Sequence, residues 1–247
     1  MPLYDNINSN IPEKPITDKV LILDLDNTLI YSYESLKSYI NFKAISTSKI
    51  TDIKDRLYKF EYDEKEAKIK VWGTKRPALK PFIYFCFCYF RKVCVWSAGT
   101  KDYVDYIVRE IFKDFRMPDV VWSREKCKIY SVFEEIKHDD GTYEKVEIKN
   151  TEKILQEFCD AYPDVKIEKL FIIDDNKKTF VHNPGNAINI PEYKPRADKE
   201  SLSRSDPSLQ QIASWLLQSH VINSEDVRLL DKSTIFTTDL ITYNNLI

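Results

Sequence analysis

The sequence lacks the patterns of cysteine and histidine that hold structural zinc or a disulfide scaffold. Its five cysteines are an odd number and include no CxxC pair, and its three histidines lie far apart. Zinc sites need ligands at short, regular spacings, and disulfide scaffolds need paired cysteines. We therefore expect reduced and mostly buried thiols in a reducing compartment, without structural zinc.

Long apolar runs and a strong charge of one sign are also missing. The longest apolar region, residues 82–96, is interrupted by Arg91 and Lys92 and is too short to cross a bilayer. The start of the chain has no apolar segment flanked by basic residues, as a secretory signal would have. The formal net charge of −2 at pH 7 gives no general attraction to nucleic acid. We expect a cytoplasmic or nuclear protein that is not secreted and has neither a membrane nor a direct nucleic-acid partner.

What the sequence does contain is an alternation of short apolar runs with segments of helical periodicity. The apolar runs predict strands at residues 19–25, 92–96, 119–123, 169–175 and 186–190. Helical spacing, with capping residues at several starts, predicts helices at residues 78–90, 100–115, 150–162 and 206–220. Strands that alternate with helices indicate the α/β class, here a three-layer, Rossmann-like domain with a parallel central sheet.

Changes of composition predict the boundaries of this domain. Residues 1–17, with several prolines and asparagines, predict an extended arm, and residues 237–247 a tail. Between them, residues 18–236 predict one catalytic domain with two insertions. Residues 31–74 contain the alternating pattern of an antiparallel ribbon, and residues 128–148 that of a β-hairpin. Both insertions are candidates to shape a substrate groove.

Polar side chains follow three of the predicted strands. The residues at these strand ends are Asp24, Asp26 and Thr28 after the first, Ser97 after the second, and Asp174 and Asp175 after the fourth. Lys149 stands just before the helix that leads to the last of these strands. Ligands collect at the carboxyl ends of the strands in an open parallel sheet. If the three strands are neighbours, these side chains converge.

Such a cluster predicts magnesium-assisted phosphoryl chemistry. Four carboxylates repel one another, so at neutral pH they need a cation, and oxygen ligands suit Mg²⁺. Asp24 and Asp26 are two residues apart and share one face of an extended chain. One can attack phosphorus to form an aspartyl-phosphate while the other serves the leaving oxygen.

Taken singly, each of these features has an ordinary structural explanation. Acidic residues often cap strands and turns, which covers both the DxD pair and Asp174-Asp175. By itself, Ser97 is typical of a loop and Lys149 of a solvated surface. The functional interpretation depends on all of them following apolar strands, or preceding the appropriate helix, in one order.

In that order, Asp24-Leu25-Asp26-Asn27-Thr28, Ser97, a lysine and Asp174-Asp175 resemble the haloacid dehalogenase-like superfamily of aspartate-nucleophile phosphotransferases. More narrowly, the chain resembles the NLI-interacting-factor-like branch, which contains the small phosphatases of the RNA polymerase II C-terminal domain. The segments that carry this second resemblance are "KRPAL" (75–79), "VWSAGTKDYVDYI" (95–107), "SREKC" (123–127) and "IDDNKKTFVHNPGNAI" (173–188).

The resemblance implies roles for individual residues. Asp24 would be the nucleophile and first metal ligand, and Asp26 the general acid and then base, with its carbonyl also on Mg²⁺. Asp175 would be a direct ligand and Asp174 a more remote one. The residues expected to hold or shape the phosphoryl site are Ser97 and the amide of Ala98, Thr28 as the residue that orients the loop, and Arg76 in the pocket wall.

Two positions depart from the branch. Gly99 stands where the branch has a serine. The lysine is ambiguous because the predicted hairpin is longer than in the small phosphatases: the segment "GTYEK" selects Lys145, whereas the position before the expected helix cap selects Lys149. We favour Lys149, because the start of the helix fixes where the side chain can reach.

The resemblance implies a Mg²⁺-dependent protein serine/threonine phosphatase that acts through an aspartyl-phosphate. Its substrate would be an extended phosphopeptide in a phosphoprotein, such as the C-terminal domain of RNA polymerase II. One alternative is a phosphatase of the same superfamily for a nucleic-acid end or a small metabolite, although residues 31–74 look too strand-like for a helical cap. Another is a catalytically silent scaffold with the same fold.

Overall fold

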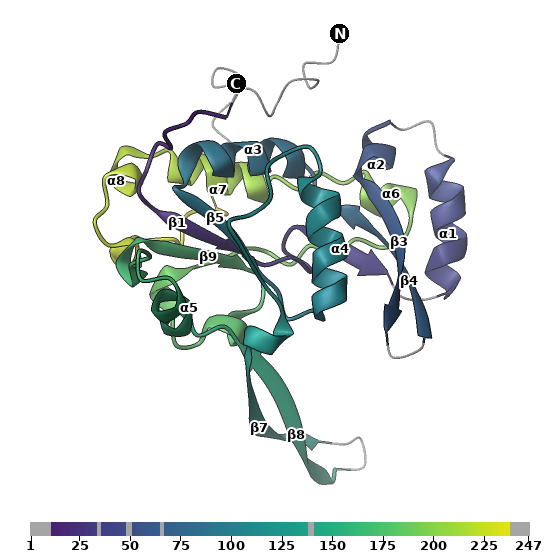
Figure 1. The fold of residues 1–247 in the computed structure, drawn as a ribbon. Coiled ribbons are helices and arrows are strands. Elements are labelled where there is room, and N and C mark those ends of the chain that lie inside the picture. Colours follow the sequence, from purple (N-terminus) through teal and green to yellow (C-terminus); the bar gives the residue numbers. More distant parts are fainter. Residues whose placement is uncertain (1–10, 34–35, 48–50, 65–66, 138–140, 238–247) are drawn as a thin grey trace.

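A five-stranded parallel sheet forms the centre of the computed structural model, which describes residues 11–33, 36–47, 51–64, 67–137 and 141–237 (Figure 1). Its strand order is β10-β9-β1-β5-β6, and every neighbouring pair is parallel. The bounds of the strands are β1 Val20–Leu23, β5 Lys92–Trp96, β6 Val120–Trp122, β9 Leu170–Asp174 and β10 Ala187–Asn189. Sequence analysis predicted all five.

Helices cover both faces of this sheet, which explains why its central strands are continuous apolar runs. Leu21 and Leu23 of β1 belong to the core cluster beneath α3, α4 and α7, whereas Val20 and Ile22 pack in the cluster around α5. The helix bounds are α3 Leu79–Tyr89, α4 Lys101–Phe112, α5 Leu155–Ala161, α7 Ser208–Leu216 and α8 Ser219–Ile222. The expected three-layer α/β architecture is therefore confirmed.

Three of the four predicted helices begin close to the expected residue, but α5 begins five residues late. It was expected from Asn150 and starts at Leu155. The ladder between β7 (Lys128–Lys137) and β8 (Tyr143–Glu152) continues as far as Glu152, so Asn150 and Thr151 lie in a strand. Hairpin pairing thus outcompetes the capping signal at this point.

A second unit, here called the cap (residues 30–75), projects beyond the main sheet (Figure 1). It contains an antiparallel sheet in the order β2-β4-β3, formed by β2 Ile30–Tyr33, β3 Leu57–Glu64 and β4 Ala67–Lys75. The predicted ribbon is β3 and β4. The helices α1 (Leu36–Ser46) and α2 (Thr51–Arg56) were not predicted, so the cap is less purely strand-like than expected.

The cap has its own small core. The ring of Trp72 stacks on that of Tyr33 at 4.1 Å between centroids, and Phe42 of α1 packs against the same indole. Leu202 of α6 (Lys199–Leu202) completes this cluster, and its carbonyl accepts a hydrogen bond from Arg56 Nη2 at 2.6 Å. These contacts tie the cap to the C-terminal part of the domain.

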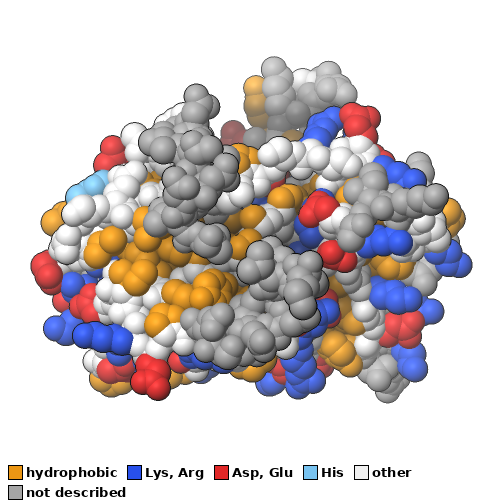
Figure 2. All heavy atoms as spheres, turned by 90° about the horizontal axis from the view of Figure 1, so that it is seen from above, with side chains coloured by type: hydrophobic (Ala, Val, Ile, Leu, Met, Phe, Trp, Pro, Cys, Tyr) orange, Lys and Arg blue, Asp and Glu red, His pale blue; other side chains and the backbone are white. Residues whose placement is uncertain are grey.

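The hairpin β7–β8 projects from the body (Figure 1), and its large side chains Ile129, Phe133 and Tyr143 are exposed. Seen from above, the molecule shows apolar side chains near the centre of one face and charges of both signs around them (Figure 2). Among the described residues, no helix is long and apolar enough to cross a membrane.

The chain ends are described in part. Of the predicted arm, residues 11–17 are described, and the amides of Ile16 and Thr17 donate hydrogen bonds to carbonyls at the end of α3. Residues 1–10 of the arm, and residues 238–247 of the predicted tail, lie outside the described residues.

All five cysteines are free thiols, and Cys86, Cys94 and Cys159 are buried.

Candidate active site

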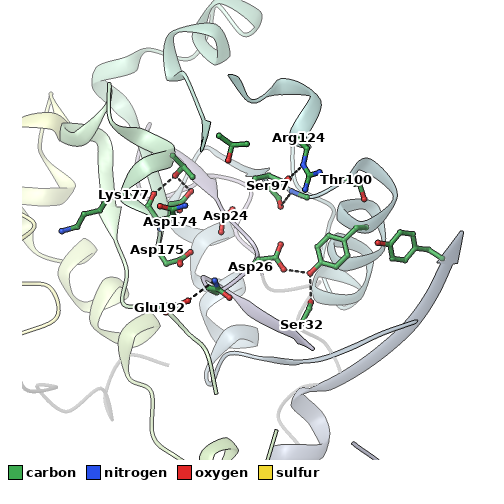
Figure 3. A pocket seen from close by; sticks show the side chains of 18 residues that line it. Asp24, Asp26, Ser32, Ser97, Thr100, Arg124, Asp174, Asp175, Lys177 and Glu192 are labelled. Atoms are coloured by element: carbon green, nitrogen blue, oxygen red, sulfur yellow. Dashed lines mark hydrogen bonds between the residues drawn. The ribbon is translucent and has the colours of Figure 1, made fainter. Parts of the chain in front are cut away.

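The sheet topology brings the polar strand ends together. Strand β1 lies between β5 and β9, and Leu23 pairs in register with both Val95 and Ile173. The residues that follow these positions therefore open into one pocket of about 870 Å³ (Figure 3). Its lining includes Asp24, Asp26, Ser97, Ala98, Asp174 and Asp175. The expectation that these strands are neighbours is thus correct.

Asp24 leaves β1 pointing into the pocket and is 7% exposed. Its Oδ1 accepts a hydrogen bond from Lys153 Nζ at 2.7 Å. Burial and, to a smaller extent, the charge of Asp174 raise the pKa of Asp24 to about 8, against the opposing charge of Lys153. A carboxyl in this environment holds its proton unless further positive charge reaches it.

The lysine of the site is Lys153. Its Nζ bridges Asp24 and Asp174, with a 2.6 Å hydrogen bond to Asp174 Oδ2, and its side chain is 1% exposed. Burial alone would lower the pKa of Lys153, but the charges of Asp174 and Asp24 raise it above its usual value. The lysine is therefore a buried cation at neutral pH.

The expected lysines lie elsewhere. Lys149 pairs with Ser131 and Lys145 with Glu135 in the hairpin ladder, and both lysine side chains are exposed. Lys149 was selected as the position just before the helix, and the helix start used for that choice is wrong. Lys153 directly precedes the N-cap of α5.

The acidic pair after β9 is held by neighbouring donors. Asp174 Oδ1 accepts a hydrogen bond from the Asn176 amide at 2.8 Å, and Oδ2 accepts one from Thr179 Oγ1 at 2.7 Å. Asp175 Oδ1 accepts one from Thr28 Oγ1 at 3.1 Å, and the Asp175 amide donates to the same hydroxyl. Thr28, which is fully buried, thus links the loop after β1 to the loop after β9.

Asp26 lies in the turn after β1, next to Asn27, which has a positive φ of 58°. Tyr103 of α4 donates its hydroxyl to Asp26 Oδ1, and this hydroxyl also lies 2.6 Å from Ser32 Oγ (Figure 3). Burial and the charge of Asp26 raise the pKa of Tyr103 well above its usual value, so the phenol stays protonated. Sequence analysis placed Tyr103 in the predicted helix at residues 100–115 and gave it no role in the site.

Ser97 and Ala98, which follow β5, also line the pocket. Ser97 Oγ accepts a hydrogen bond from the Gly99 amide at 3.0 Å, and Arg124 Nε donates to the Ala98 carbonyl at 2.6 Å. Arg124 lines the pocket but was not singled out from the sequence. Its segment, "SREKC", was the available signal.

Arg76 does not line the pocket, against expectation. Its side chain is 1% exposed, and Nε donates to Asp206 Oδ2 at 2.9 Å. Its Nη1 donates to the Thr28 carbonyl at 2.9 Å and its Nη2 to the Pro191 carbonyl at 2.8 Å. A guanidinium donates in several directions at once, so Arg76 braces the loop after β1 from behind the pocket.

Three carboxylates fit a hard metal ion. Asp24, Asp174 and Asp175 each offer an oxygen within 4.8 Å of the others. An all-oxygen donor set suits Mg²⁺ better than zinc or copper. The raised pKa values of the buried Asp24 and of Asp175 also indicate that this cluster is short of positive charge.

The fold and the site define a phosphatase of the haloacid dehalogenase-like class. More narrowly, the family model described as "NLI interacting factor-like phosphatase" matches residues 19–228, and the chain belongs to this family. The expected enzyme class, a phosphoprotein phosphatase, is thereby confirmed.

Individual relatives agree with this assignment. The CTD phosphatase-like protein 355R of Invertebrate iridescent virus 3 is 26% identical over 205 residues, which are 80% of this chain and 95% of the viral protein. A beryllium fluoride complex of the fission yeast RNA polymerase II CTD phosphatase Fcp1 has a TM-score of 0.51 and 18% identity over 81% of this chain. A second Fcp1 structure has a TM-score of 0.51 and 19% identity over 88% of this chain. The chain spans 50% and 58% of these two Fcp1 chains, and the likeness shows a shared fold.

Proposed function

We propose that this protein is a Mg²⁺-dependent protein serine/threonine phosphatase that works through an aspartyl-phosphate on Asp24. The observation that carries the proposal is the placement of two carboxyls in one pocket. Asp24 is bound to the buried Lys153, whereas Asp26 is bound to a neutral phenol. Two carboxyls in such different environments are suited to different roles, one as nucleophile and the other as acid and base.

In the first step, an Asp24 oxygen attacks phosphorus and the bond from phosphorus to the substrate oxygen breaks. Lys153 holds Asp24 through Oδ1 and limits its rotation, which favours attack in one orientation. Asp26 donates a proton to the leaving serine or threonine oxygen. Ser97 Oγ and the Ala98 amide are the proposed donors to the phosphoryl oxygens.

In the second step, water attacks phosphorus and the bond from phosphorus to Asp24 breaks. Asp26, now a carboxylate, takes a proton from that water. Inorganic phosphate leaves, and both aspartates return to their starting states. The same residue can serve both steps because the leaving oxygen and the attacking water occupy the same side of phosphorus.

The proposed metal ligands are Asp24, Asp175 and the Asp26 carbonyl. Asp174 is the more remote of the acids, because both of its oxygens already accept hydrogen bonds from protein donors. When bound, Mg²⁺ supplies charge that neutralises phosphate oxygens. It also compensates the repulsion among the buried carboxylates.

The proposed substrate is an extended phosphopeptide, such as the C-terminal domain of RNA polymerase II. The fission yeast relative is named as an RNA polymerase II CTD phosphatase, and the viral relative as CTD phosphatase-like. The pocket is lined both by the main sheet and by cap residues such as Ser32 and Tyr62, so a chain bound there would contact both units. The protein would reach its substrate in the nucleus or cytoplasm.

A substrate panel with wild-type protein and Asp24→Asn tests the proposal. Asparagine is nearly isosteric, so the variant should keep the fold and lose turnover with p-nitrophenyl phosphate and phosphopeptides in Mg²⁺. If the wild-type protein hydrolyses end-phosphorylated oligonucleotides or small metabolites but not phosphopeptides, the proposed substrate class is wrong and the alternative phosphatase is correct. No turnover of any phosphate ester would favour a silent scaffold.

A further inference from the structure

Asp26 is joined to the cap by a chain of three hydroxyl groups, and Figure 3 shows the part of it between Asp26 and Ser32. Tyr103 on α4 donates its hydroxyl to Asp26 Oδ1. The Tyr103 hydroxyl lies 2.6 Å from Ser32 Oγ on β2, and Ser32 Oγ lies 2.8 Å from the hydroxyl of Tyr58 on β3. Two of the three hydroxyls therefore belong to the cap, and the chain ends at the carboxyl proposed to act as acid and base.

The hydrogen bonds in this chain have one consistent direction. Each hydroxyl has a single proton to donate. Because Tyr103 gives its proton to Asp26, Ser32 must donate to Tyr103, and Tyr58 then donates to Ser32. The other acceptor near Tyr58, the Tyr31 carbonyl, is further away at 3.3 Å. Hydrogen bonds aligned in this way polarise one another, so the link is stronger than its separate members.

Two of the four glycines of the chain make room for these tyrosines. A Cβ at Gly73 would lie 2.3 Å from the Tyr58 hydroxyl, and a Cβ at Gly99 would lie 2.8 Å from Cδ1 of Tyr103. Neither distance is possible without movement.

We propose that the cap sets the orientation of the Asp26 carboxyl through this hydroxyl chain, which makes Tyr103, Ser32 and Tyr58 positioning residues. The inference rests on the proposed role of Asp26. With Oδ1 held by Tyr103, rotation of the carboxyl is restricted, and its proton exchange with the leaving group is confined to one orientation. Movement of β2 or β3 would shift Ser32 or Tyr58 and loosen that restriction.

The test compares substrates that need a general acid to different degrees. For wild-type protein, Ser32→Ala, Tyr58→Phe and Tyr103→Phe, kcat/KM is measured with p-nitrophenyl phosphate, phenyl phosphate and a phosphoserine peptide. This ratio reports the first step, in which the leaving oxygen receives its proton. We expect Ser32→Ala to lower kcat/KM on the peptide by about 10- to 100-fold. This loss is smaller than the full contribution of a general acid, roughly 10²–10⁴-fold, because Asp26 itself is still present. With p-nitrophenyl phosphate, whose leaving group needs no proton, the loss should be about threefold or less.

The matched control is Tyr106→Phe. Tyr106 lies three residues after Tyr103 on the same helix, is 40% exposed, and takes no part in the chain. It should show wild-type values on all three substrates. If Tyr103→Phe fails to fold, as judged by thermal unfolding, Ser32→Ala and Tyr58→Phe decide the matter.

Equal losses on all three substrates would overturn the inference, because they would mean a general disturbance of the site. Unchanged kcat/KM in both Ser32→Ala and Tyr58→Phe would overturn it too. These results are distinct from failure of the proposed function. In that case the wild-type protein itself would show no turnover, or Asp26→Asn would not lower kcat/KM on the peptide.

Discussion

Replacement of Lys153 by methionine should destabilise the protein and abolish most of its activity. Methionine keeps much of the length of the lysine side chain but removes its charge. The change leaves two buried carboxylates, Asp24 and Asp174, facing each other without the cation that now lies 2.7 and 2.6 Å from them. Removal of one partner from a buried ion pair costs about 3–5 kcal/mol. Because one lysine serves both carboxylates, we expect one such loss and not two.

The size of this loss should depend on pH. Burial holds the pKa of Asp24 above its unfolded value of 3.8, at about 8 even with Lys153 present. A carboxyl with a raised pKa binds its proton more tightly in the folded state, so its protonation favours folding at low pH. Loss of Lys153 raises this pKa further, so Asp24 is protonated in both proteins up to about pH 8, and the part of the deficit due to Asp24 should grow only above about pH 8.

Urea unfolding of wild type and Lys153→Met at pH 6 and pH 9 measures these differences. Mg²⁺ should recover part of the deficit, since it supplies positive charge to the same carboxylates. Turnover of a phosphopeptide should fall on the order of 10²–10³-fold, as when one preorganised donor is removed from a site. Lys149→Ala, on the exposed face of the hairpin, is the matched control and should keep both stability and turnover. Loss of turnover in Lys149→Ala, or wild-type stability in Lys153→Met, would refute the assignment.

Mg²⁺ at 100 times its Kd should stabilise the wild-type protein by about 2.7 kcal/mol, which is measured as a rise in its unfolding temperature. Asp175→Asn should weaken this shift, and equal shifts in the two proteins would exclude Asp175 as a ligand. Thr28→Val, which removes the hydroxyl that holds Asp175, should cost about 1 kcal/mol in urea unfolding and raise the Mg²⁺ concentration needed for half-maximal activity. Arg76→Met should cost about 3–5 kcal/mol, because it leaves Asp206 and two carbonyls without their donor. Wild-type stability in this last variant would contradict its role as a brace.

Those features of the site that depend on strand ends could be predicted from the sequence. Asp24 and Asp174 each follow a run of buried apolar residues, and such runs are visible without knowledge of distant contacts. Parallel topology then places the ends of neighbouring strands at one edge of the sheet. The acidic residues of the pocket could therefore be identified without knowledge of side-chain geometry.

The features that were missed depend on pairing between segments that are distant in sequence. The cap helices α1 and α2 form beside a sheet in which β2 is separated from β3 and β4 by more than twenty residues, and the apolar spacing of α1 is weak. Arg76 was assigned to the pocket wall because its position near a motif says nothing about which way its side chain turns. The structure directs it to Asp206, which lies 130 residues away.

Lys153 and Tyr103 illustrate the same limit at the centre of the site. The choice of lysine depended on one boundary, and that boundary was set by how far β8 stays paired with β7. Tyr103 lies within a helix whose apolar stripe explains it equally well as a core residue. Only the position of the cap, with Ser32 next to its hydroxyl, gives that residue a second role. If cap contacts decide how Asp26 is held, substitutions in β2 and β3 should alter catalysis on alkyl phosphates without touching any residue of the acidic motif.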